Sequence, residues 1–308
     1  MKSKNLNGFF SLLVILLFSF NQALSQSLFS IKNQKSLIEE IREASYSIKG
    51  EMPISINYSK LAESHRPFSD IITDGNNDIF IQARTAFQII YPSSEIMIDG
   101  GMDKSIHNYF GFGRIEPYWE SKNNEIKEAL KKAEIIIVTH EHADHIAGII
   151  NSDITKSIAS KTLLTRSQAE TLVNNPQIPA IKLSPDDIEN FNIIDYETIM
   201  PLAPGVVLIK SAGHTHGHQM IFVSLENKQE FLFIGDVAWS IENIKQLKLR
   251  PLITRNRIKE DSNALMNQMV WIKYLMDEEN IIIVPSHDDK LLQGYKENEI
   301  INESLIIN

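Results

Sequence analysis

The sequence of 308 residues contains no cysteine. This absence excludes a disulfide framework, a thiolate metal ligand and the lipobox of a lipoprotein. A metal site in this chain must therefore be built from histidines and carboxylates, both of which bind zinc.

Positive charge is also in short supply, with 30 lysines and arginines against 39 acidic residues and a formal net charge of −9. An acidic protein is a poor candidate for binding nucleic acid or an anionic membrane, because like charges repel. We therefore expect a small-molecule substrate and no nucleic-acid partner. Composition leaves the oligomeric state open.

The hydrophobic run at residues 9–20 is shorter than the roughly 20 apolar residues that span a bilayer. Lys2 and Lys4 precede this run, and Ala23-Leu24-Ser25 supplies small residues where a signal peptidase cuts. The pattern predicts a secretory signal peptide at residues 1–25 and a secreted or periplasmic protein. An uncleaved membrane anchor is the alternative.

Cleavage is expected before Gln26, with no stable membrane insertion of the mature chain. Residues 26–308 suffice for one large domain with a substantial core, and no repeat or low-complexity linker calls for a second domain. We therefore predict a single domain.

Hydrophobic periodicity predicts a mixed α/β protein with two strand-rich halves separated by helices. Helices are expected at residues 34–47, 123–133, 167–173 and 261–277. Strands are expected at residues 54–61, 85–91, 96–98, 135–138, 162–165, 205–210, 220–224, 230–234 and 281–284. The region 176–198 contains prolines and acids, which predict irregular surface structure.

Three histidines and an aspartate lie within six consecutive positions, His140-Glu141-His142-Ala143-Asp144-His145. They follow a predicted buried strand, and α/β folds usually place their sites at the carboxyl ends of strands. His140 and His142 can point into one site from an extended or turning backbone, while Asp144 and His145 stand where a helix is expected to begin. Because imidazoles and carboxylates bind zinc, the segment predicts a metal site. A solvated histidine-rich loop is the alternative, but it leaves the matching residues downstream unexplained.

Three later stretches each place a candidate ligand at or just after a predicted strand: Gly213-His214-Thr215-His216-Gly217-His218, Phe233-Ile234-Gly235-Asp236 and Pro285-Ser286-His287-Asp288. An earlier strand ends in Asp99-Gly100-Gly101. Together with the first motif, these stretches resemble the signature of the metallo-β-lactamase superfamily of metallohydrolases, over roughly residues 80–290. The resemblance implies an α/β fold, the four-layer αβ/βα metallo-β-lactamase sandwich.

The resemblance also implies two zinc ions per chain, Zn²⁺, and seven protein ligands. The first zinc would be held by three histidines, His140, His142 and His214. The second would be held by an aspartate and two histidines, Asp144, His145 and His287. Asp236 would bridge the two ions. A water between two cations loses a proton near neutral pH and attacks as hydroxide, and Asp144 is the expected catalytic residue that orients it.

These expectations predict an exported, zinc-dependent hydrolase of an ester-like bond, a lactone or a carboxylic ester. A β-lactam-hydrolysing enzyme is an alternative of second rank, because one lactamase type needs a cysteine and the other lacks a bridging aspartate. A sulfur dioxygenase with one iron and a subset of these ligands also stays open. Flavodiiron oxidoreductases use a glutamate where this chain has His142, and nucleases need a nucleic-acid-gripping region.

Both glyoxalase-II-like thioesterases and N-acyl homoserine lactonases resemble this ligand set. The sequence pattern of the lactonases continues through Gln219. However, these lactonases have a tyrosine three residues after the bridging aspartate, where this chain has Trp239. Trp239 would line the substrate pocket or belong to the core.

Four further residues near the motifs also have predicted roles. Asp99 would either hydrogen-bond a ligand histidine or cap its turn. His218 is expected to be a structural hydrogen-bonding residue. His216, where the family often has proline, is expected to face solvent, and Glu141 to point away from the metals.

Overall fold

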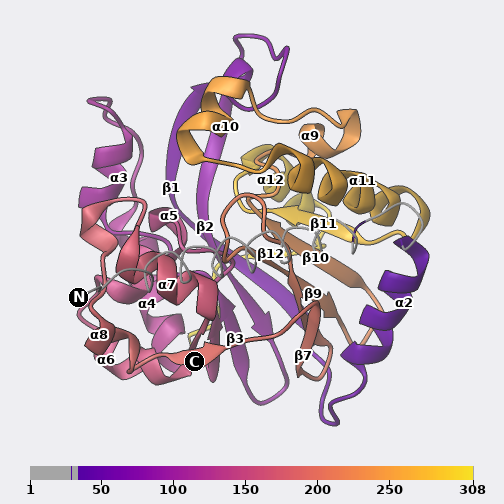
Figure 1. Cartoon of the computed structure of the whole chain (residues 1–308). Coiled ribbons are helices and arrows are strands. Elements are labelled where there is room, and N and C mark those ends of the chain that lie inside the picture. Colours follow the sequence, from indigo (N-terminus) through magenta and orange to yellow (C-terminus); the bar gives the residue numbers. More distant parts are fainter. Residues whose placement is uncertain (1–28, 30–33, 308) are drawn as a thin grey trace, which may run out of the picture.

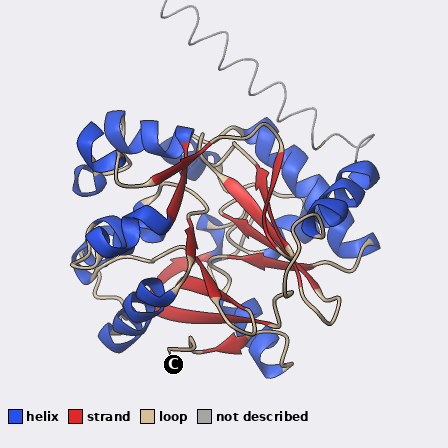
Figure 2. Ribbon diagram, turned by 90° about the horizontal axis from the view of Figure 1, so that it is seen from below, coloured by secondary structure: helices blue, strands red, loops and turns tan. Residues whose placement is uncertain are grey.

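The structure, a computed structural model, describes residue 29 and residues 34–307. Two β-sheets face each other, and helices cover the outer side of each sheet (Figures 1 and 2). This arrangement confirms the predicted four-layer αβ/βα sandwich. The predicted signal peptide and its cleavage site at Gln26 lie outside the described residues, and the single-domain boundary stays a prediction.

The first sheet contains β1 (Ser55–Pro67), β2 (Ile79–Ile90), β3 (Glu95–Ile98), β4 (Ile135–Ile137), β5 (Thr162–Thr165), β6 (Asn192–Ile194) and β12 (Asn302–Glu303). Their order across the sheet is β12-β1-β2-β3-β4-β5-β6. The pairs β1–β2 and β2–β3 are antiparallel, whereas the pairs from β3 to β6 are parallel. Because parallel strands end at the same edge, the segments after β3 and β4 emerge side by side.

The second sheet contains β7 (Ile199–Ala203), β8 (Val206–Lys210), β9 (Gln219–Ser224), β10 (Glu230–Gly235) and β11 (Ile282–Pro285). Their order is β11-β10-β9-β8-β7, and β10 and β11 are parallel. The segments after β10 and β11 therefore also emerge together, and these segments carry Asp236 and His287.

Helices form the two outer layers. The first sheet is covered by α4 (Glu120–Lys132), α5 (Ala143–Ile150), α6 (Thr155–Ile158) and α7 (Arg166–Asn174). The second is covered by α2 (Gln34–Ser45), α9 (Ile241–Gln246) and α11 (Ser262–Glu278). The other helical segments are α3 (Lys104–Phe110), α8 (Pro185–Ile188), α10 (Leu252–Ile258), α12 (Asp289–Glu297), η2 (Phe68–Asp70), η3 (Ala159–Lys161) and η4 (Pro179–Ile181).

The inner strands bury both faces, which explains their continuous hydrophobic runs. In β8, Val207 and Ile209 pack with the helices of the outer layer, while Val206 and Leu208 pack between the sheets. The period of two in strand geometry produces this alternation. Each such side chain, fully buried, contributes about 1.5–3 kcal/mol relative to an exposed one, so the sandwich is a rigid support for the loops at its edge.

Each predicted helix and strand overlaps an element of the structure, but two predictions are wrong in extent. β1 and β2 run well beyond the predicted ranges 54–61 and 85–91, since they continue to pair as far as Pro67 opposite Ile79. The region 176–198 is not wholly irregular, because it contains η4, α8 and the edge strand β6. Cross-strand pairing is a tertiary effect, and short capped turns depend on local hydrogen bonds. Hydrophobic periodicity detects neither. Within residues 29 and 34–307, no helix is long and apolar enough to cross a membrane.

Candidate metal centre

The seven predicted ligands lie at one edge of the sandwich, each in a segment that follows a strand. The loop after β4 carries His140 and His142, and His142 is the N-cap of α5. His145 projects from the first turn of α5, as the sequence predicted for the start of a helix. Asp236 directly follows β10, and His287 follows β11 by one residue more.

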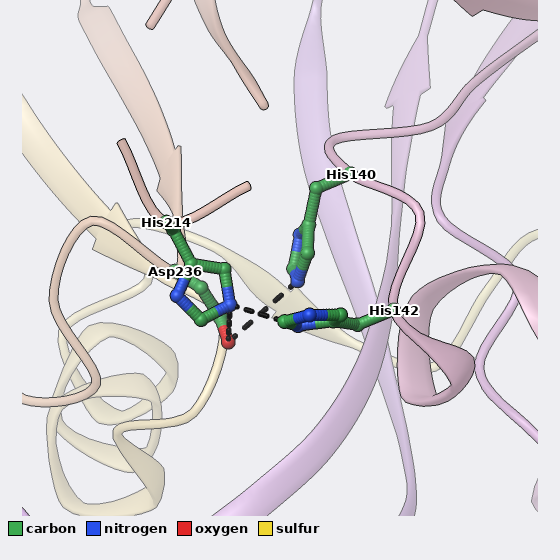
Figure 3. Close-up of side chains that lie close together, drawn as sticks. All are labelled: His140, His142, His214 and Asp236. Atoms are coloured by element: carbon green, nitrogen blue, oxygen red, sulfur yellow. Dashed lines mark hydrogen bonds and ion pairs between the residues drawn. The ribbon is translucent and has the colours of Figure 1, made fainter. Parts of the chain in front are cut away.

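The structure brings these residues into two compact groups. The first contains His140, His142, His214 and Asp236, and the second contains Asp144, His145 and His287. In each group the candidate ligand atoms all lie within 4.8 Å of one another. Figure 3 shows the first group, in which His140 and His142 enter from one side and His214 and Asp236 from the other.

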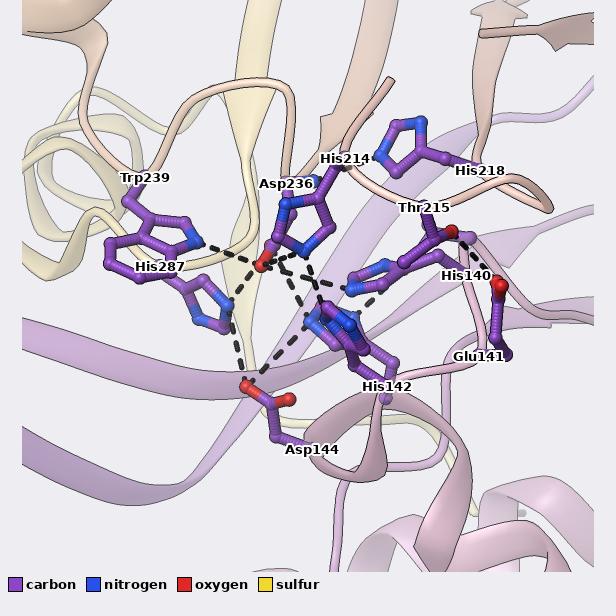
Figure 4. A network of polar contacts seen from close by, with 12 residues as sticks. His140, Glu141, His142, Asp144, His214, Thr215, His218, Asp236, Trp239 and His287 are labelled. Atoms are coloured by element: carbon purple, nitrogen blue, oxygen red, sulfur yellow. Dashed lines mark hydrogen bonds and ion pairs between the residues drawn. The ribbon is translucent and has the colours of Figure 1, made fainter. Parts of the chain in front are cut away.

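Asp236 lies between the two groups and presents one oxygen to each. Its Oδ2 is 3.2 Å from Nε2 of His214 and 3.8 Å from Nε2 of His140. Its Oδ1 is 3.0 Å from Nε2 of His287 and 3.5 Å from Nε2 of His145. Asp236 therefore connects the two groups (Figure 4).

Several of these inward-facing atoms are buried and have no hydrogen-bond partner among residues 29 and 34–307. They are Nε2 of His140, Nε2 of His145 and Oδ1 of Asp236. An unpartnered buried polar atom costs about 1–3 kcal/mol, so three at one point indicate that a partner of another kind belongs there. Imidazole nitrogens and carboxylate oxygens at this spacing fit divalent cations such as zinc.

Acceptors behind the imidazoles fix which ring nitrogen faces the centre. His214 donates from Nδ1 to Glu260 at 2.6 Å, and His145 donates from Nδ1 to Asp99 at 2.7 Å. His287 donates from Nδ1 to the Ala83 carbonyl at 2.7 Å. With the proton on Nδ1, each Nε2 keeps a lone pair for a cation.

Asp99 therefore takes the first of its two predicted roles. Besides His145, its carboxylate accepts from the Thr139 backbone N–H at 2.7 Å and from the Thr139 hydroxyl at 2.8 Å. The Thr139 oxygen lies 3.1 Å from Nδ1 of His140, so it can accept that proton in turn. One buried carboxylate thus holds two of the histidines in the loop.

Glu260 was not predicted from the sequence. It follows Lys259, which ends α10 with φ of +62°, a left-handed turn that redirects the chain toward His214. Its side chain is fully buried and also pairs with Arg250. No pattern near Glu260 in the sequence signals this contact, because its partner lies 46 positions away.

Arg84 of β2 is a second residue that sequence reasoning missed. Its Nη1 donates to Oδ2 of Asp144 at 2.8 Å, and only 8% of its side chain is exposed. An arginine just before the predicted strand 85–91 gives no sign that it points at a metal-binding loop. The ion pair places a fixed positive charge beside the second group.

His218 and Trp239 both contact Asp236. The Asp236 backbone N–H donates to Nε2 of His218 at 3.1 Å, which confirms the structural role predicted for that histidine. Gly235 has φ of +50°, and a Cβ there would lie 2.6 Å from the His218 ring. The Trp239 indole donates to Oδ2 of Asp236 at 2.8 Å and lines the adjoining cavity, so it is a pocket residue rather than a core residue.

Glu141 and His216 belong to neither ligand group. Glu141 accepts from the Thr215 hydroxyl at 2.7 Å, on the far side of His142 (Figure 4). His216 is exposed, as predicted.

The pKa shifts of the buried groups favour a positive charge in the centre. Burial lowers the pKa of His142 to about 3, and it lowers the pKa of His140 well below the usual value, so both are neutral ligands. For His145 and His214, burial also opposes the charged form, but neighbouring carboxylates outweigh it and raise the pKa. Burial likewise opposes ionisation of Asp236, yet the surrounding histidines hold its pKa well below its usual value. The negative potential of the centre therefore favours a bound positive charge.

A cavity of about 500 Å³ opens onto both groups, with Asp144, Asp236 and Trp239 in its wall. A neighbouring cavity of about 630 Å³ shares His142 and His214 with it. These volumes are typical of sites for small molecules.

No protein-family model matches the chain. An N-acyl homoserine lactonase from Bacillus sp is 25% identical over 223 residues, covering 65% of this chain and 79% of the lactonase. A hydroxyacylglutathione hydrolase from Prochlorococcus marinus (strain MIT 9301) is 32% identical over 109 residues, which cover 34% of this chain and 36% of that enzyme.

Solved structures match more of the chain at lower identity. A quorum-quenching N-acyl homoserine lactone lactonase aligns with a TM-score of 0.62 and 18% identity, over 83% of this chain and 100% of that one. AidC, a dizinc quorum-quenching lactonase, aligns with a TM-score of 0.53 and 13% identity, over 74% of this chain and 85% of that one. At such identities the likeness shows the fold.

The chain therefore has the metallo-β-lactamase fold that its motifs resemble. Its relatives and its buried group of histidines and aspartates place it among the metal-dependent hydrolases of that fold.

Proposed function

We propose that the protein is an exported di-zinc hydrolase that cleaves an ester-like bond, a lactone or a carboxylic ester, in a small molecule. The observation that carries the proposal is Asp236, whose two oxygens face two separate ligand groups. A single ion would need only one of these groups. The lactonase and the hydroxyacylglutathione hydrolase among the relatives support the type of bond, and the dizinc lactonase among the structural neighbours supports the metal.

In this proposal, each group would hold one zinc ion and Asp236 would contact both. When bound, the ions lower the pKa of a water toward neutrality and polarise the carbonyl of the scissile bond. The chain supplies ligands whose geometry is already fixed. Glu260, Asp99 and the Ala83 carbonyl hold three imidazoles from behind, so little reorganisation is needed on binding.

Asp144 is the residue that we assign to the attacking water. It lies in the cavity wall, with its Oδ2 3.5 Å from Nε2 of His287. Burial opposes its ionisation, but Arg84 and the nearby histidines outweigh burial and hold its pKa well below the usual value. An ionised carboxylate at this place can accept a hydrogen bond from the water and orient it toward the substrate.

The shape of the site supports a small-molecule substrate. The cavity is large enough for a small acyl compound, and its wall combines Phe110, Ile178 and Trp239 with the polar centre. The wall also carries charged side chains outside the ligand groups, Arg66, Arg114 and Arg257, so the cavity suits a small molecule with both apolar and polar parts.

Metal analysis followed by a substrate panel tests the proposal. We expect close to two zinc equivalents per purified mature chain, and turnover of lactones or carboxylic esters above that of thioesters, phosphoesters and β-lactams. One iron with little zinc would move the protein to the dioxygenase alternative. Preference for β-lactams would favour the lactamase alternative.

Export is tested separately by sequencing the amino terminus of secreted or periplasmic material. A terminus at Gln26 is expected because Ala23 and Ser25 flank a suitable bond. An intact Met1 in a membrane fraction would show that the segment is an anchor.

A further inference from the structure

The two ligand groups are supported alike in one respect. Each contains a histidine whose Nδ1 donates to a buried carboxylate, His214 to Glu260 and His145 to Asp99. This support raises the basicity of the ligand in both groups. It therefore gives neither predicted metal position an advantage.

Arg84 distinguishes the groups, because its guanidinium contacts the second one directly. Nη1 of Arg84 lies 2.8 Å from Oδ2 of Asp144, and 3.3 Å and 3.4 Å from Nδ1 and Nε2 of His287. The same Asp144 oxygen lies 3.5 Å from Nε2 of His287, so it faces the point where a cation would bind. In the first group the corresponding cation, Arg250, pairs with Glu260, which stands between it and the ligand His214.

Asp144 is also the residue that compensates the charge of Arg84. The guanidinium is buried, and its Nη2 donates only long hydrogen bonds of 3.3 Å to the neutral oxygens of Ser64 and Gln82. Its Nε has no hydrogen-bond partner in the described part of the chain. A buried cation with neutral neighbours needs its carboxylate, so Arg84 competes for the oxygen that a metal would use.

We propose that Arg84 makes the position formed by Asp144, His145 and His287 the weaker of the two, so that the chain binds its metals in two separable steps. This inference rests on the proposed function, in which both groups hold metal. A carboxylate shared with a guanidinium donates less charge to a cation, and the two positive charges repel each other at short range in a buried site. The first group, with no cationic side chain in direct contact among the described residues, fills first.

The test is a metal titration of the metal-free mature protein. Zinc binding is measured in competition with a chromogenic chelator, and cobalt absorption follows the filling of each position. We expect two dissociation constants that differ by at least about tenfold in the wild type. Arg84→Met should tighten the second position by about 10–100-fold and narrow this gap, whereas Arg84→Lys, which keeps the charge, should preserve it.

A second variant tests the same inference even if Arg84→Met does not fold. Gln82→Glu gives Arg84 another carboxylate within reach of Nη2, so it should release Asp144 and tighten the second position. Two equal sites in the wild type, or a second position that neither variant tightens, would overturn the inference. A chain that binds no zinc would overturn the proposed function, and this inference with it.

Discussion

The two halves of the metal centre are held in place by different means. The half from the first sheet is one loop, in which His140, His142 and His145 follow β4 and enter α5 together. One buried carboxylate, Asp99, ties this loop through the backbone and hydroxyl of Thr139 and through His145. Local chain geometry and a single anchor therefore position several ligands at once.

The half from the second sheet has three ligands in three separate segments, each with its own anchor. Glu260 holds His214, Trp239 and His218 hold Asp236, and the Ala83 carbonyl holds His287. These anchors come from distant parts of the chain. One half therefore depends on local structure and the other on tertiary contacts, so substitutions in the second half should disturb one ligand at a time.

Asp236→Ala should have the largest effect, since this carboxylate belongs to the second half but faces both groups. In the proposed di-zinc centre, removing it takes a negative ligand from both cations at once. We expect metal retention to weaken and turnover to fall by several orders of magnitude, on the order of 10³-fold or more, while the core keeps the fold intact. Zinc content, turnover and circular dichroism of the variant are the measurements.

Asp236→Asn is the matched control, because it keeps the shape and loses the charge. If Asp236→Ala keeps two zinc equivalents and near-normal turnover, the ligand assignment in the second half of the chain is wrong.

Glu260→Gln should have an intermediate effect confined to one ligand. The amide still accepts from His214 but no longer carries the charge that raises its basicity, so metal affinity at the first position should fall by about 10–100-fold. Chelator competition measures this loss. Because Glu260 also pairs with buried Arg250, the double variant with Arg250→Gln separates loss of stability from loss of affinity.

Asp99→Asn should be measured beside Glu260→Gln, to compare how many metal positions each substitution weakens. Asp99 holds the loop as well as His145, so its loss should weaken both metal positions. Equal, single-position effects of the two substitutions would contradict the difference between the halves.

The sequence allowed the first half of the centre to be predicted more fully than the second. Four ligands of the loop occupy six consecutive positions after a hydrophobic strand, so spacing alone suggested a shared site. His214, Asp236 and His287 were single polar residues near strand ends, and only the order of the motifs identified them. The parallel pair β10–β11 shows why two of them meet, which no local pattern reveals.

Two contacts that support the centre could not be predicted for the same physical reason. Glu260 and Arg84 act through contacts that span 46 and 60 positions, and their neighbours in sequence carry no periodic or turn signal for those contacts. The role of Asp99 could be predicted as one of two alternatives, because Asp99 lies at the end of a strand that precedes the motif. Long-range polar contacts depend on the packed fold, whereas strands and ligand motifs leave a local trace.

Trp239→Phe should have a smaller effect, because it removes one hydrogen bond to Asp236 and leaves every ligand in place. A hydrogen bond to a charged group contributes about 1.5–3 kcal/mol, and part of that is recovered by water, so we expect turnover to fall about tenfold. Metal content should stay near that of the wild type. Loss of both zinc ions in this variant would show that Asp236 cannot keep its position without the hydrogen bond from the indole.

His216→Ala should have the smallest effect of all. His216 lies two residues from His214 in the same loop, so the variant tests whether nearness in sequence is enough to matter. Its side chain is exposed and belongs to neither ligand group, and the turn around it is held by other contacts, among them the Gly213 backbone N–H that donates to the Thr215 carbonyl at 3.0 Å. Turnover should therefore stay well within about tenfold of the wild type, with unchanged zinc content. Loss of zinc on this substitution, with His214 intact, would show that the loop supplies a different imidazole to the metal. The second half of the centre would then have to be rebuilt around it.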